Sequence, residues 1–395
     1  MFDKRTIRDL DLAGRTILLR VDYNVPLKDG VVADDYRIKK SLPTINYLRE
    51  RGCKLIIISH LGRPDGQVKT EFSLKPVAEA LERLVSAPVV FAADCVGDQA
   101  IQAAKALEPG GLLLLENLRF HPEEEINDRE FARQLTIPAE YFVQDAFGNA
   151  HRTHASMVAV TEFLPALAGF LLEEEVRQLS VAIENPMRPL VAIIGGAKIA
   201  DKIQLINRLL AQANTVVIGG AMANTFLKAQ GKEIGKSLYD ETGLDEAKDI
   251  MSHADKAGVE LMLPERDLAV TDHIGEDAAR REVAADQVAA EDIILDFGTA
   301  STDHLLNIME RTGTVIWNGP LGMTELKQFA LGSERLADFI AKQRVNCVVG
   351  GGDTAGFIEG LGLVDKFTHV STGGGASLEL LSGRELPAIS ALMDK

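Results

Sequence analysis

A glycine-rich stretch near the end of the chain has the residue types and spacing of an anion-binding loop. It spans 348–356 (VVGGGDTAG), where apolar residues lead into three glycines, Asp353 and Thr354. This order is typical of a strand, a tight turn and a helix N-terminus, whose free N–H groups attract anions. Asp353 could hold a divalent cation beside a phosphate. An ordinary βα turn with a capping Asp has the same pattern, but a second such stretch at 371–377 (STGGGAS) favours anion binding.

Two lysines follow another glycine turn, in GGAKIADK at 195–202. Because Lys198 and Lys202 are four residues apart, we predict that they begin a helix and share one face, from which both could reach phosphates. A solvated lysine pair is the commoner explanation of that spacing alone. The string GKS at 235–237 resembles the end of a P-loop, but position 230 is Gln where that motif requires Gly. We therefore predict an ordinary loop there and no Walker A motif.

Short apolar runs alternate with longer amphipathic stretches along the whole chain. This pattern predicts an α/β fold with two doubly wound parallel-sheet, Rossmann-like domains joined by a hinge helix at 170–184, which Pro186 and Pro189 terminate. The expected boundaries are 1–170, a connector at 171–187, 188–378, and a C-terminal segment at 379–395. The predicted strands are 15–21, 54–59, 88–92, 111–116 and 141–144 in the first domain, and 190–194, 215–218, 259–263, 314–317, 346–349 and 367–370 in the second.

Polar residues collect just past the predicted strand ends of the first domain, where open α/β sheets bind ligands. Four of them are arginines, with Arg63 and Arg119 after strands and Arg37 and Arg152 on loops nearby. Any one of these arginines, taken alone, could be an ordinary surface charge. Four at one level, in a chain with a net charge of −16, indicate an anionic small molecule, because Arg forms forked bonds to phosphate and carboxylate.

The remaining composition excludes several classes of protein. The negative net charge argues against nucleic-acid binding, and the sequence predicts neither a membrane-spanning helix nor a signal peptide. Cys53, Cys95 and Cys347 are interpreted as buried thiols in a reducing, cytoplasmic compartment, not as disulfides or metal ligands. His151 and His154 are interpreted as capping or packing residues, since no Cys or third His lies near them in the sequence. We expect a monomer.

Eight strings spread over nearly the whole chain together resemble phosphoglycerate kinases. They occur in that family's order: VDYNVP at 21–26, SHLGRP at 59–64, LRFHPEEE at 118–125, DAFGNAHRTHAS at 145–156, IIGGAKIADKI at 193–203, VIWNGPLG at 315–322, VVGGGDTA at 348–355 and STGGGASLELL at 371–381. The resemblance implies reversible phosphoryl transfer from 1,3-bisphosphoglycerate to MgADP, giving 3-phosphoglycerate and MgATP, in glycolysis and gluconeogenesis. We expect direct in-line transfer.

The resemblance also implies roles for particular residues. The first domain would bind phosphoglycerate with Asp22, Tyr23, Asn24, Arg37, His60, Leu61, Gly62, Arg63, Arg119 and Arg152. The second would bind the nucleotide with Gly195, Lys198, Lys202, Gly219, Asn318, Glu325, Gly351, Gly352, Asp353 and Thr354, and Asp353 would hold Mg²⁺. Catalysis is assigned to Arg37, Lys202 and the backbone N–H groups of Gly352 and Gly375, which would neutralise the transferring phosphoryl group. The last residues would fold back onto the first domain.

Five positions depart from the family's strings. Tyr23, Tyr36 and Asn149 are peripheral to charge recognition, whereas Ala221 and the turn at 297–299 (FGT) put the shape of the nucleoside pocket in question.

Because each substrate is assigned to its own domain, hinge closure about 170–184 would bring them together and exclude water. Another two-domain acyl-phosphate or carboxylate kinase would keep the glycine turns but not the arginine set. A non-catalytic binding protein would need only one ligand crevice.

Overall fold

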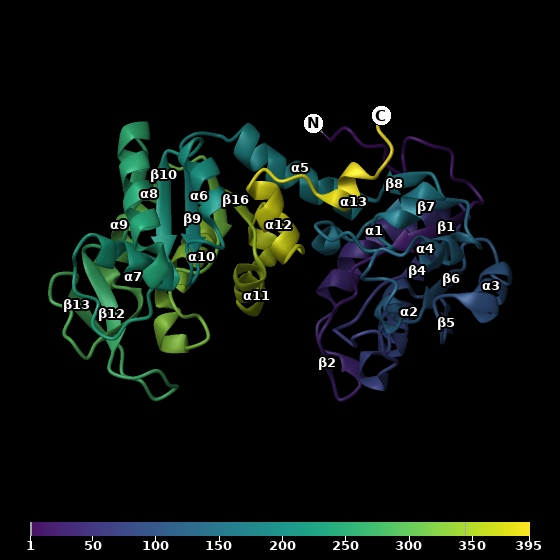
Figure 1. Ribbon diagram of the computed structural model, residues 1–395, viewed down its shortest axis with the longest axis horizontal. Helices are drawn as coiled ribbons and strands as arrows, with labels where there is room; N and C mark the ends of the chain where they lie inside the picture. Colours follow the sequence, from purple (N-terminus) through teal and green to yellow (C-terminus); the bar gives the residue numbers. More distant parts are fainter. Residues whose placement is uncertain (1, 344) are drawn as a thin grey trace. The chain divides into compact units, whose positions relative to one another are not determined.

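The computed structural model describes residues 2–343 and 345–395, which form two compact units (Figure 1). Unit 1 comprises Met1–Arg177 and Glu385–Lys395, and unit 2 comprises Gln178–Arg384. Helix α5 (Phe170–Glu184) carries the chain from one unit to the other. Near the C-terminus, helix α12 (Gly374–Leu381) extends past the expected boundary at 379, and the division falls after Arg384. No helix among the described residues is long and apolar enough to cross a membrane.

Unit 1 is built on a six-stranded parallel sheet. Its strand order is β5 (Val89–Ala92), β6 (Leu112–Leu115), β4 (Lys54–Ile58), β1 (Thr16–Arg20), β7 (Tyr141–Gln144) and β8 (Ala166–Ala168). The central strands are nearly all apolar because helices cover both faces of such a sheet. The predicted strands lie within about a residue of these bounds, but β8 was not predicted, since three residues of Ala-Leu-Ala carry no periodic signal.

Helices and short turns connect the strands of unit 1. They are α1 (Tyr36–Glu50), α2 (Lys75–Val85), α3 (Gly97–Lys105), α4 (Arg129–Thr136) and α13 (Pro387–Ser390), with 3₁₀ turns η1 (Thr70–Phe72), η2 (Leu118–Phe120), η3 (Phe147–Asn149) and η4 (Ala159–Glu162) and the hairpin β2 (Leu27–Lys28) and β3 (Val31–Val32).

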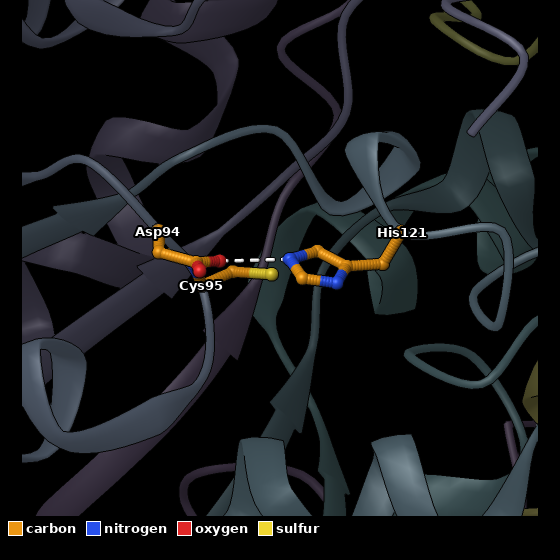
Figure 2. A group of neighbouring side chains, drawn as sticks. All are labelled: Asp94, Cys95 and His121. Carbon is orange, nitrogen blue, oxygen red and sulfur yellow. Dashed lines mark hydrogen bonds and ion pairs between the residues drawn. The ribbon is translucent and has the colours of Figure 1, made fainter. Parts of the chain in front are cut away.

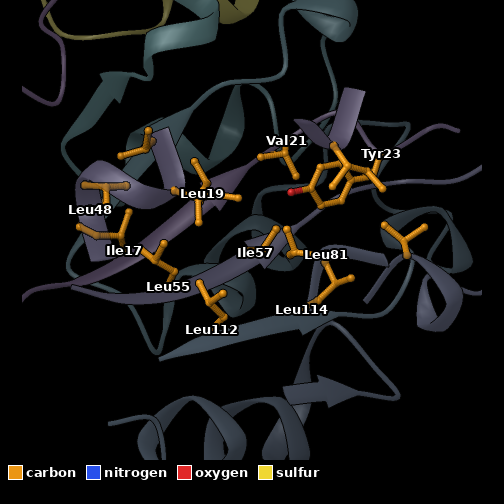
Figure 3. Close-up of a cluster of buried hydrophobic side chains, with 14 of the residues drawn as sticks. Ile17, Leu19, Val21, Tyr23, Leu48, Leu55, Ile57, Leu81, Leu112 and Leu114 are labelled. Atoms are coloured by element: carbon orange, nitrogen blue, oxygen red, sulfur yellow. The ribbon is translucent and has the colours of Figure 1, made fainter. Parts of the chain in front are cut away.

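Alternate residues of three neighbouring strands form the core of unit 1 (Figure 3). Ile17 and Leu19 of β1 lie beside Leu55 and Ile57 of β4 and Leu112 and Leu114 of β6, with Leu48 of α1 and Leu81 of α2 packed over them. All of these side chains are at most about 1% exposed. Burying a side chain of this size stabilises the fold by about 1.5–3 kcal/mol. The strand ends that carry the polar residues are therefore held on a rigid frame.

The two ends of the chain pair with each other and with β8. Arg5 N donates to Met393 O (2.8 Å), Met393 N donates to Ala166 O (3.1 Å), and Lys4 forms an ion pair with Asp394 (2.6 Å). The last residues are thus part of unit 1, although more than two hundred residues of unit 2 precede them in the chain.

Unit 2 contains a second six-stranded parallel sheet, so the predicted fold class is confirmed. The order is β11 (Glu260–Met262), β10 (Thr215–Gly219), β9 (Leu190–Gly195), β15 (Thr314–Asn318), β16 (Asn346–Val349) and β17 (His369–Val370). Its helices are α6 (Ile203–Leu210), α7 (Gly220–Ala229), α8 (Leu244–Ala257), α9 (Thr299–Met309), α10 (Leu331–Gln343), α11 (Gly352–Gly360) and α12, with 3₁₀ turns η5 (Glu241–Gly243), η6 (Lys327–Phe329) and η7 (Val364–Lys366).

A small antiparallel sheet in unit 2 was not predicted. It pairs β12 (Asp267–Thr271) with β13 (Arg281–Ala284) on one side and β14 (Ile293–Phe297) on the other. The sequence of β13 is Arg-Glu-Val-Ala, and two charged residues in a four-residue edge strand hide the alternation that predicts strands.

Candidate functional site

The sequence-predicted polar residues of unit 1 meet at the carboxyl ends of β1, β4, β6 and β7. We call the set Arg37, Arg63, Arg119 and Arg152 the arginine basin. Arg63 follows β4, Arg119 lies in η2 after β6, and Arg152 lies in the loop after η3. Arg37 was predicted on a loop, which is wrong: it is the second residue of α1. The first turn of that helix, not a flexible segment, directs its guanidinium.

A chain of hydrogen bonds joins the basin to the strand ends. Arg37 Nη1 donates to Asp22 Oδ2 (2.7 Å) and to Asn24 O (3.4 Å). Asn24 Oδ1 accepts from Gly62 N (2.9 Å), and Arg119 Nη1 donates to Gly62 O (2.9 Å). Gly62 has a φ of +62°, and a Cβ there would lie 2.3 Å from the Phe72 ring, so only glycine fits this junction.

His60 lies beneath the basin and is neutral. Burial lowers its pKa well below the ordinary value, and the charges of Arg20, Arg119 and Arg152 act in the same direction. Arg20 Nη2 lies 3.3 Å from His60 Nδ1. Since a guanidinium can only donate, Nδ1 is the acceptor and Nε2 carries the proton. The Nε2–H group is therefore a neutral donor available for an anion.

The sequence interpretation missed the residues that support His60. Arg20 is fully buried at the end of β1, and its Nε donates to Ser156 Oγ (3.0 Å). Ser156 in turn donates through N and Oγ to the buried Glu124 (2.9 and 2.6 Å). An arginine at the end of an apolar strand was the available signal, because a buried charge requires partners. His154 packs 3.8 Å from Glu124, in agreement with the predicted packing role.

The basin has more positive charge than its own partners neutralise. Among the described residues, Arg152 Nε is buried without a hydrogen-bond partner, and Arg63 is exposed with none. Arg119 Nε lies 3.1 Å from Glu125 Oε1, but the geometry is not that of a hydrogen bond. Burial lowers the pKa of His154 to about 3, assisted by Arg119 and Arg152. Buried donors without acceptors are costly, so the basin is suited to a ligand that supplies anionic oxygens.

Tyr23 and Leu61 contribute to the frame of this site and are buried. Tyr23 N donates to Ser59 Oγ (2.8 Å), and its hydroxyl pairs with Ser41 Oγ (2.8 Å). Leu61 O accepts from Asn117 Nδ2 (2.7 Å). Both residues therefore fix the loops after β1 and β4 rather than present charged groups.

Two helix N-termini adjoin in unit 2, where the glycine-rich stretches were predicted to bind anions. Helix α11 begins at Gly352, after Gly351 with a φ of +92°, and α12 begins at Gly374. A Cβ on Gly374 would lie 3.4 Å from Gly352 N, and one on Gly352 would meet nothing within 4 Å. The unpaired N–H groups of both first turns, including that of exposed Gly375, can act together on one anion.

Buried polar contacts hold this loop in place. Thr354 Oγ1 accepts from Gly319 N (2.7 Å), and Gly351 N donates to Ser377 Oγ (3.2 Å). Asn318 Nδ2 is buried without a hydrogen-bond partner among the described residues and lies 3.1 Å from the position of a Cβ on Gly351. Asn318 can therefore donate to a ligand that approaches the loop.

The prediction for the two lysines is wrong in its local structure. Helix α6 begins only at Ile203, so Lys202 is its N-cap and Lys198 lies in the preceding turn, exposed. Residues 196–202 form bends and a turn instead of a helix, so the two side chains do not share a helix face. Lys202 Nζ instead donates to Gly195 O (2.5 Å), Asn318 O (3.0 Å) and Asn318 Oδ1 (2.6 Å). Burial lowers the Lys202 pKa to about 8, opposed by the charges of Asp353 and Asp201.

A cavity of about 500 Å³ in unit 2 has Asp353 and Glu325 among its lining residues. Leu238 and Ile274, which also line it, are exposed apolar residues (66% and 56%). Its volume and largely apolar lining are typical of a small-molecule pocket. The departures at Ala221 and Phe297 both fall on this lining, as does Lys236 of the predicted ordinary loop.

Two glycines allow strand ends to approach each other beside this cavity. A Cβ on Gly195 would lie 2.0 Å from Pro320 O, and a Cβ on Gly219 would lie 2.8 Å from Leu321 Cα. Any larger residue at either position would push the loop after β15 away from β9 and β10.

Comparison with known proteins gives one consistent result. A family profile described as phosphoglycerate kinase matches residues 7–384. The chain is 49% identical over 392 residues to the phosphoglycerate kinase of Moorella thermoacetica and 47% identical over 392 residues to that of Pelotomaculum thermopropionicum, in both cases covering 99% of this chain and 100% of the relative. Solved phosphoglycerate kinases from Coxiella burnetii (TM-score 0.88, 40% identity) and Pyrococcus horikoshii (TM-score 0.82, 30% identity) match 98% of both chains.

Proposed function

The chain belongs to the phosphoglycerate kinase family, and from this premise we propose how its residues divide the reaction. It is a kinase that transfers phosphate between 3-phosphoglycerate and ATP or ADP, a step of glycolysis. The alternative of another acyl-phosphate or carboxylate kinase is not favoured. What remains to be assigned is the binding and catalytic role of each residue.

The arginine basin binds the phosphoglycerate. Arg63, Arg119 and Arg152 supply forked donors, and His60 supplies one neutral N–H group. The observation that carries this assignment is the buried Arg152 Nε without a partner, because a donor at that depth requires an acceptor from outside the chain. Asp22 and Asn24 orient Arg37 and can also accept from the substrate hydroxyl.

The cavity and the two adjoining helix N-termini bind the nucleotide. Apolar side chains such as Leu238 and Ile274 would cover the base, and Glu325 at the lining of the cavity would accept from a ribose hydroxyl. The amides of Gly352 and Thr354 would face the phosphates, together with Lys198 and Asn318, while Gly351, whose own N–H donates to Ser377 Oγ, would shape the turn with its φ of +92°. Gly195 and Gly219 act by leaving room for this approach.

The residues around Asp353 fit a magnesium ion. Asp353 is exposed and is the only acidic residue in the first turn of α11. A single protein carboxylate that completes a shell of phosphate oxygens and water is the usual arrangement for Mg²⁺. When bound, the ion would neutralise charge on the nucleotide phosphates. Relatives of this family use MgATP in general, and the assignment to Asp353 is part of the proposal.

Transfer itself requires positioning and charge neutralisation rather than a protein nucleophile. An oxygen of the ADP terminal phosphate attacks the phosphorus of the acyl phosphate in line, and the bond to the carboxyl oxygen breaks. Arg37 and Lys202 exchange some of their internal acceptors for equatorial oxygens of the transferring group. The N–H groups of Gly352 and Gly375 add fixed dipoles where that charge develops.

Because unit 1 and unit 2 each bind one substrate, transfer requires them to approach. We assign this movement to hinge bending about α5, which continues from one unit into the other. Small-angle scattering tests it: the radius of gyration should fall only when both substrates are bound, and an unchanged radius during normal turnover would refute it. We further propose that the protein is cytoplasmic, which the three buried cysteines without disulfides support. We also propose that it is a monomer, which sedimentation equilibrium would test.

A coupled assay tests the proposed roles directly. Activity should require both ATP and 3-phosphoglycerate, and Arg152→Ala should raise the KM for 3-phosphoglycerate without changing that for ATP. Arg133→Ala is the matched control, because this arginine lies on α4 of the same unit and its side chain pairs, within the described part of the chain, only with the exposed Glu130. Equal effects of the two substitutions would refute the role of the basin.

A further inference from the structure

Three potential metal ligands meet in unit 1 outside the arginine basin. Asp94, Cys95 and His121 each offer one ligand atom, and these atoms lie within 4.8 Å of one another. It is the one such group of His, Cys and acidic residues in the part of the chain that the structure describes. The sequence interpretation assigned no metal role to Cys95, since the three cysteines are odd in number and far apart in the sequence.

The parallel pairing of β5 with β6 brings the three residues together. Ala92 of β5 is the register partner of Leu115 of β6. Asp94 and Cys95 follow β5, and His121 follows η2, the turn after β6. Residues more than twenty positions apart therefore occupy neighbouring strand ends. This placement depends on the sheet and is not visible in local spacing.

All three ligand atoms point at one region of space. His121 Nε2 lies 2.7 Å from Asp94 Oδ1, and Figure 2 shows the Cys95 sulfur directed at the same edge of the imidazole. A nucleophilic triad would need the thiol and the carboxylate on opposite ring nitrogens. Convergence on one nitrogen is instead the arrangement of ligands around a common centre.

We propose that Asp94, Cys95 and His121 form a binding site for a thiophilic divalent metal ion of the zinc class. Thiolate, imidazole and carboxylate are the ligands that Zn²⁺ takes in proteins, and in tetrahedral sites they lie roughly 3.3–3.8 Å apart. The present separations differ from that range by about 1 Å, which side-chain rotation can supply. Three protein ligands leave a fourth position for water.

The site is reachable and chemically distinct from the proposed magnesium site. The side chains of His121 and Asp94 are 29% and 45% exposed, whereas Cys95 is buried. On binding, the S–H bond of Cys95 breaks, a sulfur–metal bond forms, and the proton passes to solvent without any change in oxidation state. Mg²⁺ prefers oxygen ligands and octahedral geometry, so it should not compete here.

Cobalt(II) provides a direct test on the full-length protein. With excess Mg²⁺ present, one equivalent of Co²⁺ should produce a near-ultraviolet thiolate-to-cobalt charge-transfer band that one equivalent of Zn²⁺ abolishes. Cys95→Ser should remove the band, and His121→Gln should weaken Zn²⁺ binding by at least about 100-fold, beyond the effect of losing an outer-shell partner. Since His121→Gln leaves the buried thiol intact, it remains informative if Cys95→Ser does not fold.

Cys53→Ser is the matched control. Cys53 is also a buried thiol of unit 1, but its S–H group donates to Leu12 O (3.0 Å), and it belongs to no such cluster among the described residues. Its replacement should leave the band unchanged. Binding of Co²⁺ without the charge-transfer band, as expected for the exposed pair of His273 and Asp272, would overturn the proposal. So would a band that survives in Cys95→Ser.

Discussion

Replacing Arg37 with Ala removes the one guanidinium of the basin that is held by a buried carboxylate. Arg37 Nη1 lies 2.7 Å from Asp22 Oδ2, and the two side chains are 33% and 8% exposed. The first turn of α1 directs the side chain. In the proposed mechanism this guanidinium stabilises charge that develops only during transfer, so its loss should affect turnover more than binding.

The expected size of the effect follows from comparable donors. Loss of one preorganised donor to a transition-state oxyanion lowers kcat by about 10²–10³, or roughly 3–4 kcal/mol. The loss in the free energy of unfolding should be smaller than the loss in transition-state stabilisation. Asp22 keeps its backbone surroundings, and the loss of its charged partner costs on the order of 1–3 kcal/mol. Arg37→Lys should recover only part of the rate, because an ammonium cannot form the forked contact.

Steady-state kinetics in both directions, with a thermal melt of each variant, separate these effects. Arg133→Ala, which loses an exposed ion pair of the same unit, should keep a kcat close to that of the unmodified protein. Retention of more than about a tenth of the kcat by Arg37→Ala would refute a transition-state role. So would a loss confined to the KM for 3-phosphoglycerate, since that pattern indicates equal stabilisation of ground and transition states.

Three further predictions concern unit 2. Asp353→Asn should shift the Mg²⁺ dependence of activity to higher concentrations, and an unchanged metal titration would exclude Asp353 as the ligand. Gly195→Ala should lower stability by about 1–3 kcal/mol in urea unfolding, because its Cβ would meet Pro320 O at 2.0 Å; Gly352→Ala, with nothing within 4 Å, should not. The Lys202 ammonium loses its charge as pH rises through about 8, so kcat/KM for MgATP should fall there. The Lys202→Arg variant should not show this fall in kcat/KM at alkaline pH. A fall that persists in the variant would mean that another group loses its proton there.

The sheets could be predicted from sequence because their signal is local. The strands β1, β4 and β6 are nearly pure runs of Ile and Leu, and α5 carries a helical pattern that ends before Pro186. Each polar residue just past such a run is placed at the ligand-binding edge by the topology alone. That is why the basin arginines could be named before their contacts were known.

The predictions that were wrong or missing concern residues whose contacts lie in distant segments of the chain. Lys202 has helical spacing from Lys198, yet its ammonium bonds to oxygens of Gly195 and Asn318, and α6 begins only after it. Arg20 lies at the end of a largely apolar strand, and its side-chain partners His60 and Ser156 lie 40 and 136 residues away. Local propensity cannot register such pairings, because the tertiary fold supplies the compensation for burying the charge.

Arg37 and Lys202 share a property that links these structural facts to the mechanism. Each is a cation held by internal oxygen acceptors: the carboxylate of Asp22 for Arg37, and neutral carbonyl groups for Lys202. Neither is left unpaired, so the fold does not bear the cost of an isolated buried charge. A phosphoryl oxygen, being anionic, is a stronger acceptor than the carbonyl groups it would replace at Lys202. The Lys202 ammonium should therefore exchange its carbonyl acceptors for phosphoryl oxygens only when a phosphate is bound. At Arg37 the competing carboxylate is already charged, so its donors should turn fully to the substrate only as negative charge grows in transfer. On this reasoning we propose that Lys202 contributes mainly to binding the phosphate group that is transferred, and Arg37 mainly to stabilising charge in the chemical step.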